Sequence, residues 1–347
     1  MRLLANGRPL ARARSGALGK FVLRLQAPAR SARYRLVLQA GSRRVRLPDL
    51  VVRPVVLAAV GDVNLGDRIG AAIRSFGSGY PWTSAAPLLR AADVAIANLE
   101  SAVSTRGTPA AKKYTFRGDP AAVPAVARAG IDVVSVANNH SLDFGAGAFL
   151  DTLRHFRRAG IATVGGGHDS AAARRPAIVS AGGLRVAILG YSDVRPLGFD
   201  ATPTRPGTAR ADAGAIAEDV RAARRRADAV VVYFHWGTEL ARTPDGRQRS
   251  FAAAALAAGA TVVLGAHPHV LQPVERSGRR LVAWSLGNFV FGATSAGTSA
   301  TGVLTVGLDR RGVRWNELVP ARIDGVRPIL DGSRAGATLA RLARARG

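Results

Sequence analysis

The feature that most constrains the fold is a series of short, continuous apolar runs that each end in polar residues. Continuous apolar runs are typical of strands buried on both faces of a sheet. The segments between them are rich in Ala, Arg and Leu at helical spacing and end near glycine. This alternation predicts an α/β fold. The runs occupy residues 55–62, 92–100, 131–140, 184–193, 228–237, 260–269 and 279–289.

Residues 1–53 follow a different pattern, in which apolar and polar residues alternate. The segments GKFVLRLQ, RYRLVLQA and RRVRLPDLVV are separated by Pro, Ser and Gly. This predicts a small all-β module, which could be an incomplete immunoglobulin-like sandwich. Residues 54–330 would form the main domain, ending in an antiparallel hairpin that turns at residues 310–312. Residues 331–347 would form a basic, peripheral C-terminal tail or helix.

The composition narrows the classes of protein. No apolar run approaches the roughly 18 residues of a membrane-spanning helix, so no transmembrane segment is expected. The N-terminal segment MRLLANGRPLARARSG is basic but lacks the apolar stretch of a secretory signal, so a cytoplasmic location stays open. With no cysteine in the chain, any metal must be held by nitrogen and oxygen ligands.

The net charge of +26 allows two interpretations. It could serve a polyanionic partner, or it could reflect general arginine enrichment along the whole chain. The sequence lacks a concentrated basic stripe interleaved with aromatic residues, which disfavours nucleic acid as the partner.

Metal-ligand side chains stand at the ends of the apolar runs. Four of the six histidines do so, and ligand sites of α/β proteins lie where the carboxyl ends of strands converge. Each residue alone could be a helix cap or turn residue. Together, their carboxylate, amide and imidazole groups suit Mn, Fe, Zn or Mg. They are Asp62, Glu100, Asn139, His140, His235, His267 and His269.

The ordered motifs GD, NLE, NNH, HWG, GAHPH and SLGNF, spread over residues 55–292, resemble the CapA proteins of poly-gamma-glutamate capsule synthesis. These belong to the calcineurin-like metallophosphatase superfamily. The resemblance implies a four-layer α/β/β/α sandwich, two divalent metal ions and a location in the cell envelope or outside the cell. It also implies an acidic polymer or phosphoester as substrate and other capsule-synthesis proteins as partners.

The same resemblance assigns roles to the strand-end residues. Asp62 and His269 would hold one ion, Glu100 would bridge both ions, and the second ion would be held by Asn139, His235 and His267. His140 would lie outside the ligand set as general acid, oriented by Asp143.

Two further positions bear on the site. The superfamily commonly begins with Asp-x-His, whereas this chain has Asn64 two residues after Asp62, so a neutral amide would be the ligand there. In the segment KKYTFRGD, Lys113 and Arg117 are candidates for binding a phosphate or a polymer carboxylate. An ordinary solvated loop is the alternative.

The sequence therefore leaves two hypotheses of function. One is a metal-dependent, phosphoesterase-like hydrolase acting in capsule or exopolymer synthesis. The other is a non-catalytic, metal-containing component that binds or guides an acidic envelope polymer, which Asn64 and the high basicity favour.

Overall fold

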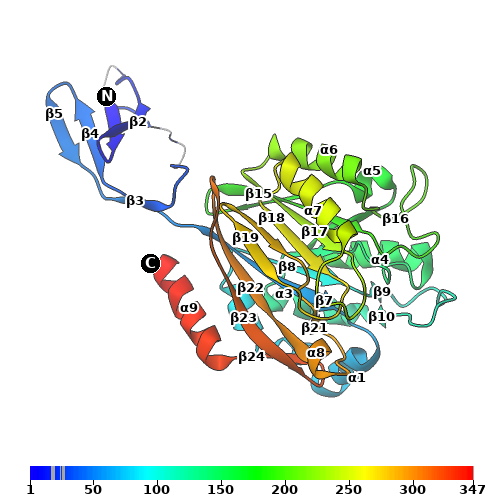
Figure 1. The fold of residues 1–347 in the computed structure, drawn as a ribbon. Helices are drawn as coiled ribbons and strands as arrows, with labels where there is room; N and C mark the ends of the chain where they lie inside the picture. The colour runs from blue at the N-terminus through cyan, green and yellow to red at the C-terminus, as the bar shows by residue number, and fades with distance from the viewer. Residues whose placement is uncertain (17–19, 24, 26–27, 347) are drawn as a thin grey trace.

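We describe the fold from a computed structural model, in which residues 1–16, 20–23, 25 and 28–346 are described (Figure 1). Within these residues, one large sheet has the order β12-β11-β8-β7-β22-β23-β24, with β21 also paired to β7. Its strands are β7 (Val55–Val63), β8 (Val94–Leu99), β11 (Val133–Ser135), β12 (Ala162–Val164), β21 (Asn288–Val290), β22 (Ala300–Asp309), β23 (Gly312–Asp324) and β24 (Arg327–Leu330).

A second large sheet has the order β14-β15-β17-β18-β20-β19. The central strands of both sheets are parallel, and antiparallel strands flank them. The strands of the second sheet are β14 (Ala177–Ala181), β15 (Leu184–Ser192), β17 (Ala229–His235), β18 (Val262–Ala266), β19 (Val274–Ser277) and β20 (Arg280–Ala283).

The two sheets pack face to face, and helices cover their outer faces. Alternate residues of β7 show why: Leu57 and Ala59 belong to the apolar cluster between the sheets, whereas Val56 and Ala58 belong to the cluster beneath the helices. All nine residues of β7 are buried, which explains its uninterrupted apolar run. The predicted α/β/β/α sandwich is confirmed.

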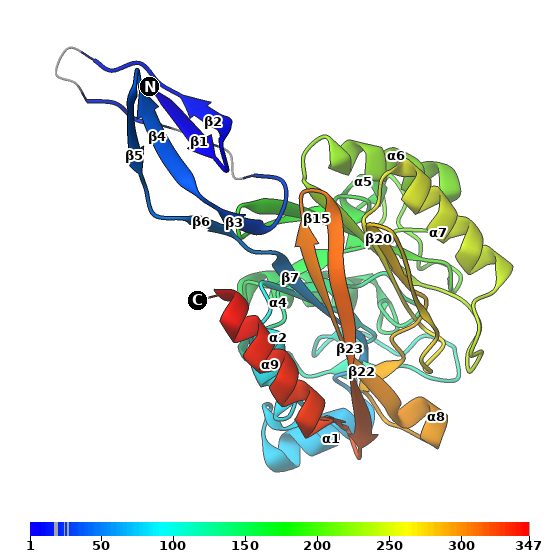
Figure 2. The same ribbon diagram turned by 60° about the vertical axis from the view of Figure 1, so that its left-hand side comes forward.

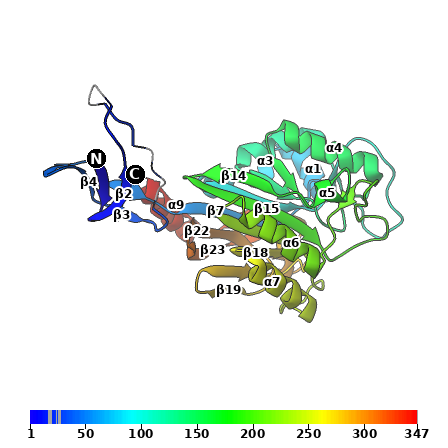
Figure 3. The same cartoon turned by 90° about the horizontal axis from the view of Figure 1, so that it is seen from above.

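Figure 3 shows the layers edge on, with α3 and α4 on one outer side and α6 and α7 on the other. The helices beside the first sheet are α1 (Asp67–Phe76), α2 (Ala86–Arg90), α3 (Val123–Ala129) and α4 (Gly145–Arg158). Those beside the second are α5 (Ser170–Ala173), α6 (Ala213–Arg224) and α7 (Gly246–Ala258). In the described part of the chain, no helix is long and apolar enough to cross a bilayer.

One close approach fixes how β7 meets β21. The backbone nitrogen of Asp62 donates to the carbonyl oxygen of Gly287 over 2.9 Å, and Asn288 is paired with Asp62. A Cβ atom at Gly61 would lie 1.8 Å from that same carbonyl oxygen, well inside van der Waals contact. Only glycine therefore fits at position 61, immediately before a predicted metal ligand.

The N-terminal part forms small sheets that stand apart from the sandwich and lead into β7 (Figure 2). Its strands are β1 (Arg2–Ala5), β2 (Arg8–Arg12), β3 (Ala32–Tyr34), β4 (Leu36–Ala40), β5 (Arg43–Arg46) and β6 (Leu50–Val52). The first alternating segment, residues 19–26, lies partly outside the described residues, and its described residues are not in strands.

The predicted hairpin is confirmed, since β22 and β23 are joined by a turn at Arg310 and Arg311. The C-terminal helix α9 (Gly332–Arg346) is also present but is not peripheral. Leu342 on this helix is 2% exposed and belongs to the core cluster on the outer side of the first sheet. Arg341 stacks over the ring of Trp315 on β23, 3.9 Å from the ring centre. The helix therefore closes part of the outer face of the sheet.

Candidate metal centre

Strand ends of both sheets meet at one edge of the sandwich. Asp62 stands at the end of β7, Glu100 follows β8, His235 ends β17 and His267 follows β18. The hydroxyl group of Tyr233 donates to the carbonyl oxygen of Val60 over 2.7 Å and so joins β17 to β7. This bond lies two residues before Asp62 and two residues before His235, and it holds their strand ends together.

The two carboxylates of the cluster differ in their hydrogen bonding. Both Asp62 and Glu100 are completely buried. Asp62 accepts from the side-chain amide of Asn98 over 2.7 Å and from the backbone nitrogen of His267 over 3.2 Å. Neither oxygen of Glu100 has a hydrogen-bond donor in the described residues. A buried polar group without a partner costs about 1 to 3 kcal/mol, so Glu100 needs an electropositive partner.

The imidazoles of His235 and His269 are oriented by amides. His235 Nε2 lies 2.7 Å from Asn139 Oδ1, and its Nδ1 lies 3.2 Å from Asn98 Nδ2. His269 Nδ1 lies 2.9 Å from Asn288 Oδ1. Such contacts fix the plane of each ring. In His269 they leave Nε2 outside the contact with Asn288, whereas both ring nitrogens of His235 are in contact with amides.

The backbone around His267 and His269 is strained. Their φ angles are +96° and +58°, in the region that residues with a Cβ rarely adopt. Strain of this kind costs about 1 to 3 kcal/mol per residue and is concentrated at functional sites. Pro268 between them limits the conformations of the segment. The result is that both imidazoles project from one short turn after β18.

The donor atoms fit divalent ions. In the described residues, two groups have donor atoms that all lie within 4.8 Å of one another. One contains Asp62, Glu100 and His235, the other Glu100, His267 and His269, so Glu100 is common to both. His267 Nδ1 is buried without a hydrogen-bond partner among the described residues, as are the oxygens of Glu100. Unpaired buried nitrogen and oxygen donors are what an ion such as Mn, Fe, Zn or Mg requires.

The division of these residues into two groups by distance matches only in part the division between two ions that the resemblance implied. Asp62 is grouped with His235, although its Oδ2 is also 3.3 Å from His269 Nδ1. Asn139 is beside His235, as implied. All five acid and histidine side chains, with Asn139, are therefore within one cluster.

Burial and neighbouring charges shift the titration of the cluster. Burial raises the pKa of Glu100 well above 4.5, and repulsion from Asp62 raises it further. Burial, aided by the nearby His269, lowers the pKa of His267 to about 4, and burial also lowers that of His235 well below 6.5. Burial lowers the pKa of His269, but Glu100 and Asp62 outweigh this and raise it to about 10. At neutral pH the imidazoles of His235 and His267 are thus uncharged, and that of His269 carries a proton.

His140 lies at the border of the cluster. Its Nδ1 is 2.7 Å from Asp143 Oδ2, and its Nε2 is 3.9 Å from Glu100 Oε1. The ring of Phe116 stacks on the imidazole with the centres 4.1 Å apart, and the backbone nitrogen of Phe116 donates to Asp143 over 2.7 Å. These contacts hold the imidazole in place, with Nε2 facing the carboxylate.

Lys112 is a site residue that the sequence reasoning missed. Its Nζ lies 2.6 Å from Asp143 Oδ1, 3.2 Å from His140 Nδ1 and 2.5 Å from the carbonyl oxygen of Asn139. The neighbouring Lys113, which was predicted to bind substrate, is exposed and lies over the ring of Tyr114. The segment KKYTFRGD therefore places Lys112 at the site, and the assignment of Lys113 to substrate binding stays a prediction.

Arg117 and Asn64 are occupied by local contacts. The guanidinium of Arg117 donates to the backbone oxygens of Arg106 and Gly107 and stacks over Phe144. Asn64 Oδ1 accepts a hydrogen bond of 2.7 Å from the backbone nitrogen of Gly66. That bond is an Asx turn, which shapes the loop before α1.

Two buried amides were also missed. Asn98 links Asp62 to His235, and Asn138 donates to Asn98 Oδ1 over 3.1 Å and to the carbonyl oxygen of Leu99 over 2.7 Å. The available signal was an asparagine near the end of a buried apolar run, since a buried amide needs hydrogen-bond partners.

The chain is similar to known proteins of capsule synthesis. The family model described as bacterial capsule synthesis protein PGA_cap matches residues 56–293. The chain is 31% identical over 272 residues to the PGA biosynthesis protein CapA of Bacillus subtilis (strain 168), covering 78% of this chain and 72% of that protein. It is 30% identical over 277 residues to the capsule biosynthesis protein CapA of Bacillus anthracis, covering 78% of this chain and 67% of that protein.

A solved structure is similar in fold. The crystal structure of a hypothetical protein from Thermus thermophilus matches with a TM-score of 0.51 and 15% sequence identity, and the match covers 78% of this chain and 100% of that chain. The family match spans the strands that carry the cluster and confirms the resemblance seen in the sequence. The chain therefore belongs to the bacterial capsule synthesis protein family PGA_cap.

Proposed function

We propose that this chain is a metal-dependent, phosphoesterase-like hydrolase that acts in the synthesis of a capsule or of a poly-gamma-glutamate-type exopolymer. The observation that carries the proposal is Glu100, a completely buried carboxylate without a hydrogen-bond donor among the described residues, common to two groups of metal-ligand side chains. The names of the relatives support the polymer and a place of action in the cell envelope.

The proposed ligands are Asp62, Glu100, Asn139, His235, His267 and His269. Divalent ions at such a site stabilise negative charge on a phosphoryl or acyl group as Lewis acids. The protein provides the orientation: Asn98 holds Asp62 and His235, and Asn288 holds His269. Asn64 is left out of the proposed ligand set because its oxygen accepts from Gly66.

His140 is the proposed proton donor to the leaving group. Asp143 and Lys112 both contact its Nδ1 side, which leaves Nε2 as the nitrogen that faces the cluster. Burial lowers the pKa of His140, and the hydrogen bond to Asp143 partly offsets this. A lowered pKa makes the protonated imidazole a stronger acid, which suits it to donate a proton in general acid catalysis.

The second candidate is a metal-containing protein that binds or guides an acidic polymer without cleaving it. The specific observation in its favour is Asn64, where the superfamily commonly has a histidine. Its amide oxygen is already used in a turn, so one ion would have fewer protein ligands. The net charge of +26 suits an acidic polymer as well.

The test is metal analysis of the purified protein, followed by a panel of phosphoester substrates with Mn, Fe, Zn or Mg supplied. We expect turnover by the wild type and a fall of about 100 to 10,000-fold in rate in His140→Ala, with bound metal unchanged. His155→Ala on α4 is the matched control, because His155 is outside the cluster, and it should retain activity.

Unchanged activity in His140→Ala would show that the proposed proton donor is wrong. If the wild type cleaves no phosphoester but binds an acidic polymer in a salt-sensitive way, the hydrolase proposal fails and the second candidate is supported.

A further inference from the structure

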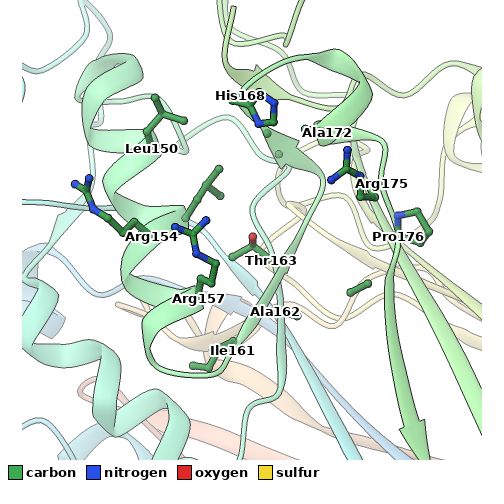
Figure 4. Close-up of a pocket in the computed structure, with 14 residues that line it drawn as sticks. Leu150, Arg154, Arg157, Ile161, Ala162, Thr163, His168, Ala172, Arg175 and Pro176 are labelled. Atoms are coloured by element: carbon green, nitrogen blue, oxygen red, sulfur yellow. The ribbon is translucent and has the colours of Figure 1, made fainter.

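A cavity of about 560 Å³ lies at the open edge of the sandwich, and none of the proposed metal ligands lines it. This is the edge at which β12 ends the first sheet and β14 ends the second. Its walls are α4 on one side and the segment from β13 (Gly166–Gly167) through α5 to the start of β14 on the other (Figure 4). The cavity is therefore separate from the candidate metal centre.

One face of α4 forms a wall of the cavity. Leu150, Leu153, Arg154 and Arg157 all line it, and their spacing of three, four and seven residues places them along one side of a helix. Figure 4 shows the arginines extending from α4, with Arg175 on the opposite wall. Three guanidinium groups, two from α4 and one from the loop between α5 and β14, therefore border one opening.

The charge around the cavity is unbalanced. Its lining includes Arg154, Arg157, Arg175 and His168 but no Asp or Glu in the described residues. Arg154 pairs with Asp151 below the wall, and that carboxylate is shared with Arg106. The guanidinium groups of Arg157 and Arg175 have no hydrogen-bond or ion-pair partner within the described part of the chain. Asp169 supplies part of a counter-charge, because it lies 3.1 Å from His168 and also acts electrostatically on Arg175. Arg157 and Arg175 are exposed to solvent, and an anionic ligand would replace water at their guanidinium groups and relieve the remaining repulsion.

The apolar residues that line the cavity, together with its volume, indicate what kind of anion it could bind. Leu150, Leu153 and Ile161 supply apolar surface beside the arginines. The volume is in the range of sites for organic ligands and exceeds what one inorganic anion fills. We infer that this cavity is a binding site for an organic polyanion, in which carbon chain packs on the apolar residues while carboxylate or phosphate groups pair with Arg157 and Arg175.

The absence of cysteine from the sequence makes a local probe possible. Thr163, on β12, lines the cavity, so Thr163→Cys introduces a single thiol there. The rate at which a neutral thiol reagent modifies it reports occupancy of the cavity, and Ser250→Cys on the exposed side of α7 is the control. The measurement needs no turnover, so its outcome is separate from that of the proposed hydrolase.

Three probes distinguish the source of the anion: a glutamate oligomer of about ten residues, citrate and inorganic pyrophosphate. We expect the oligomer or citrate to slow modification of Thr163→Cys without affecting Ser250→Cys. Adding Arg157→Ala and Arg175→Ala should weaken that protection about tenfold or more. Protection by the oligomer alone would identify a polymer segment as the ligand, and equal protection by citrate would identify a small polyanion.

The matched charge control is Arg225→Ala with Arg226→Ala, which removes two exposed arginines at the end of α6. The inference is overturned if neither organic probe protects the thiol. It is equally overturned if pyrophosphate alone protects, or if the control pair weakens protection as much as the cavity pair does.

Discussion

Replacing Glu100 by glutamine should stabilise the metal-free protein and at the same time remove metal binding. Glu100 is isosteric with glutamine and is buried beside Asp62 without a hydrogen-bond donor among the described residues. The amide of Glu100→Gln carries no charge and can donate to Asp62. The carboxylate is repelled by Asp62 and attracted by protonated His269. Removing the unsatisfied, charged group should add about 1 to 3 kcal/mol to the free energy of unfolding, or about 1 to 4 °C in Tm for a chain of this length.

The pH dependence of the stability gained by Glu100→Gln tests whether the charge of the buried carboxylate is the cause. Burial and Asp62 raise the pKa of Glu100 in the folded protein, so the folded state binds its proton more tightly than the unfolded state. The contribution of Glu100 to stability is then lost as pH rises through its folded pKa. The variant should therefore gain little at low pH and progressively more as the pH rises.

The assay is thermal and urea unfolding of EDTA-treated protein from pH 4 to 8, together with metal analysis of protein purified with metal. Glu275→Gln, which removes an exposed glutamate on β19, is the control and should change neither quantity. The reasoning is refuted if Glu100→Gln destabilises the metal-free protein while retaining the metal content of the wild type.

Three further predictions follow from the cluster. His235→Ala and His267→Ala should each lower bound metal, and unchanged metal content in both would show that the ligand assignment is wrong. In EDTA-treated protein, stability should rise with pH from about 4 to 6.5, because the pKa of His267 is lowered to about 4, and fall from about 6.5 toward 10, because that of His269 is raised to about 10. His267→Ala should flatten the rise in stability below pH 6.5, and His269→Ala should flatten the fall in stability above it. Lys112→Met, which removes the ammonium group beside Asp143, should shift the pH profile of activity while leaving bound metal unchanged; an unchanged profile would contradict a role for Lys112 in orienting His140.

The sequence allowed the sandwich to be predicted because its strands are buried on both faces. A run such as residues 55–62 has no polar face and is explained by burial between two layers. The sequence also allowed the closeness of Asp62 and His235 to be predicted. Both residues stand at the ends of buried runs, and parallel strands end at a shared edge of the fold. The predictions of the fold and of the cluster thus depended on sequence patterns that extend over whole strands.

The details that were missed depend on side-chain direction where no periodicity exists. Lys112 and Lys113 are adjacent in a loop, so the sequence alone could not show which one faces His140. Arg117 turns toward backbone oxygens of another part of the chain, a contact that sequence spacing cannot reveal. Asn98 lay within an apolar run, where its amide was overlooked.

The helix α9 was expected to be peripheral because it is short, basic and terminal. Its leucines at positions 339 and 342 are three residues apart and so share a helical face. That spacing was a sign of docking, and the structure buries Leu342 in the core. The helix is therefore docked on the sheet through its leucines, although most of its other side chains are small or basic.

The close approach of Gly61 to Gly287 has a consequence for how relatives of this chain can diverge. The glycine is required by the crossing of two strands. Asp62 beside it accepts hydrogen bonds from Asn98 and His267, but its negative charge is required only if a cation binds. Selection on folding would then keep the glycine in a descendant that has lost its chemistry, and the aspartate would be free to drift. Within the two-letter motif GD, the first residue thus reports descent and the second reports retained activity.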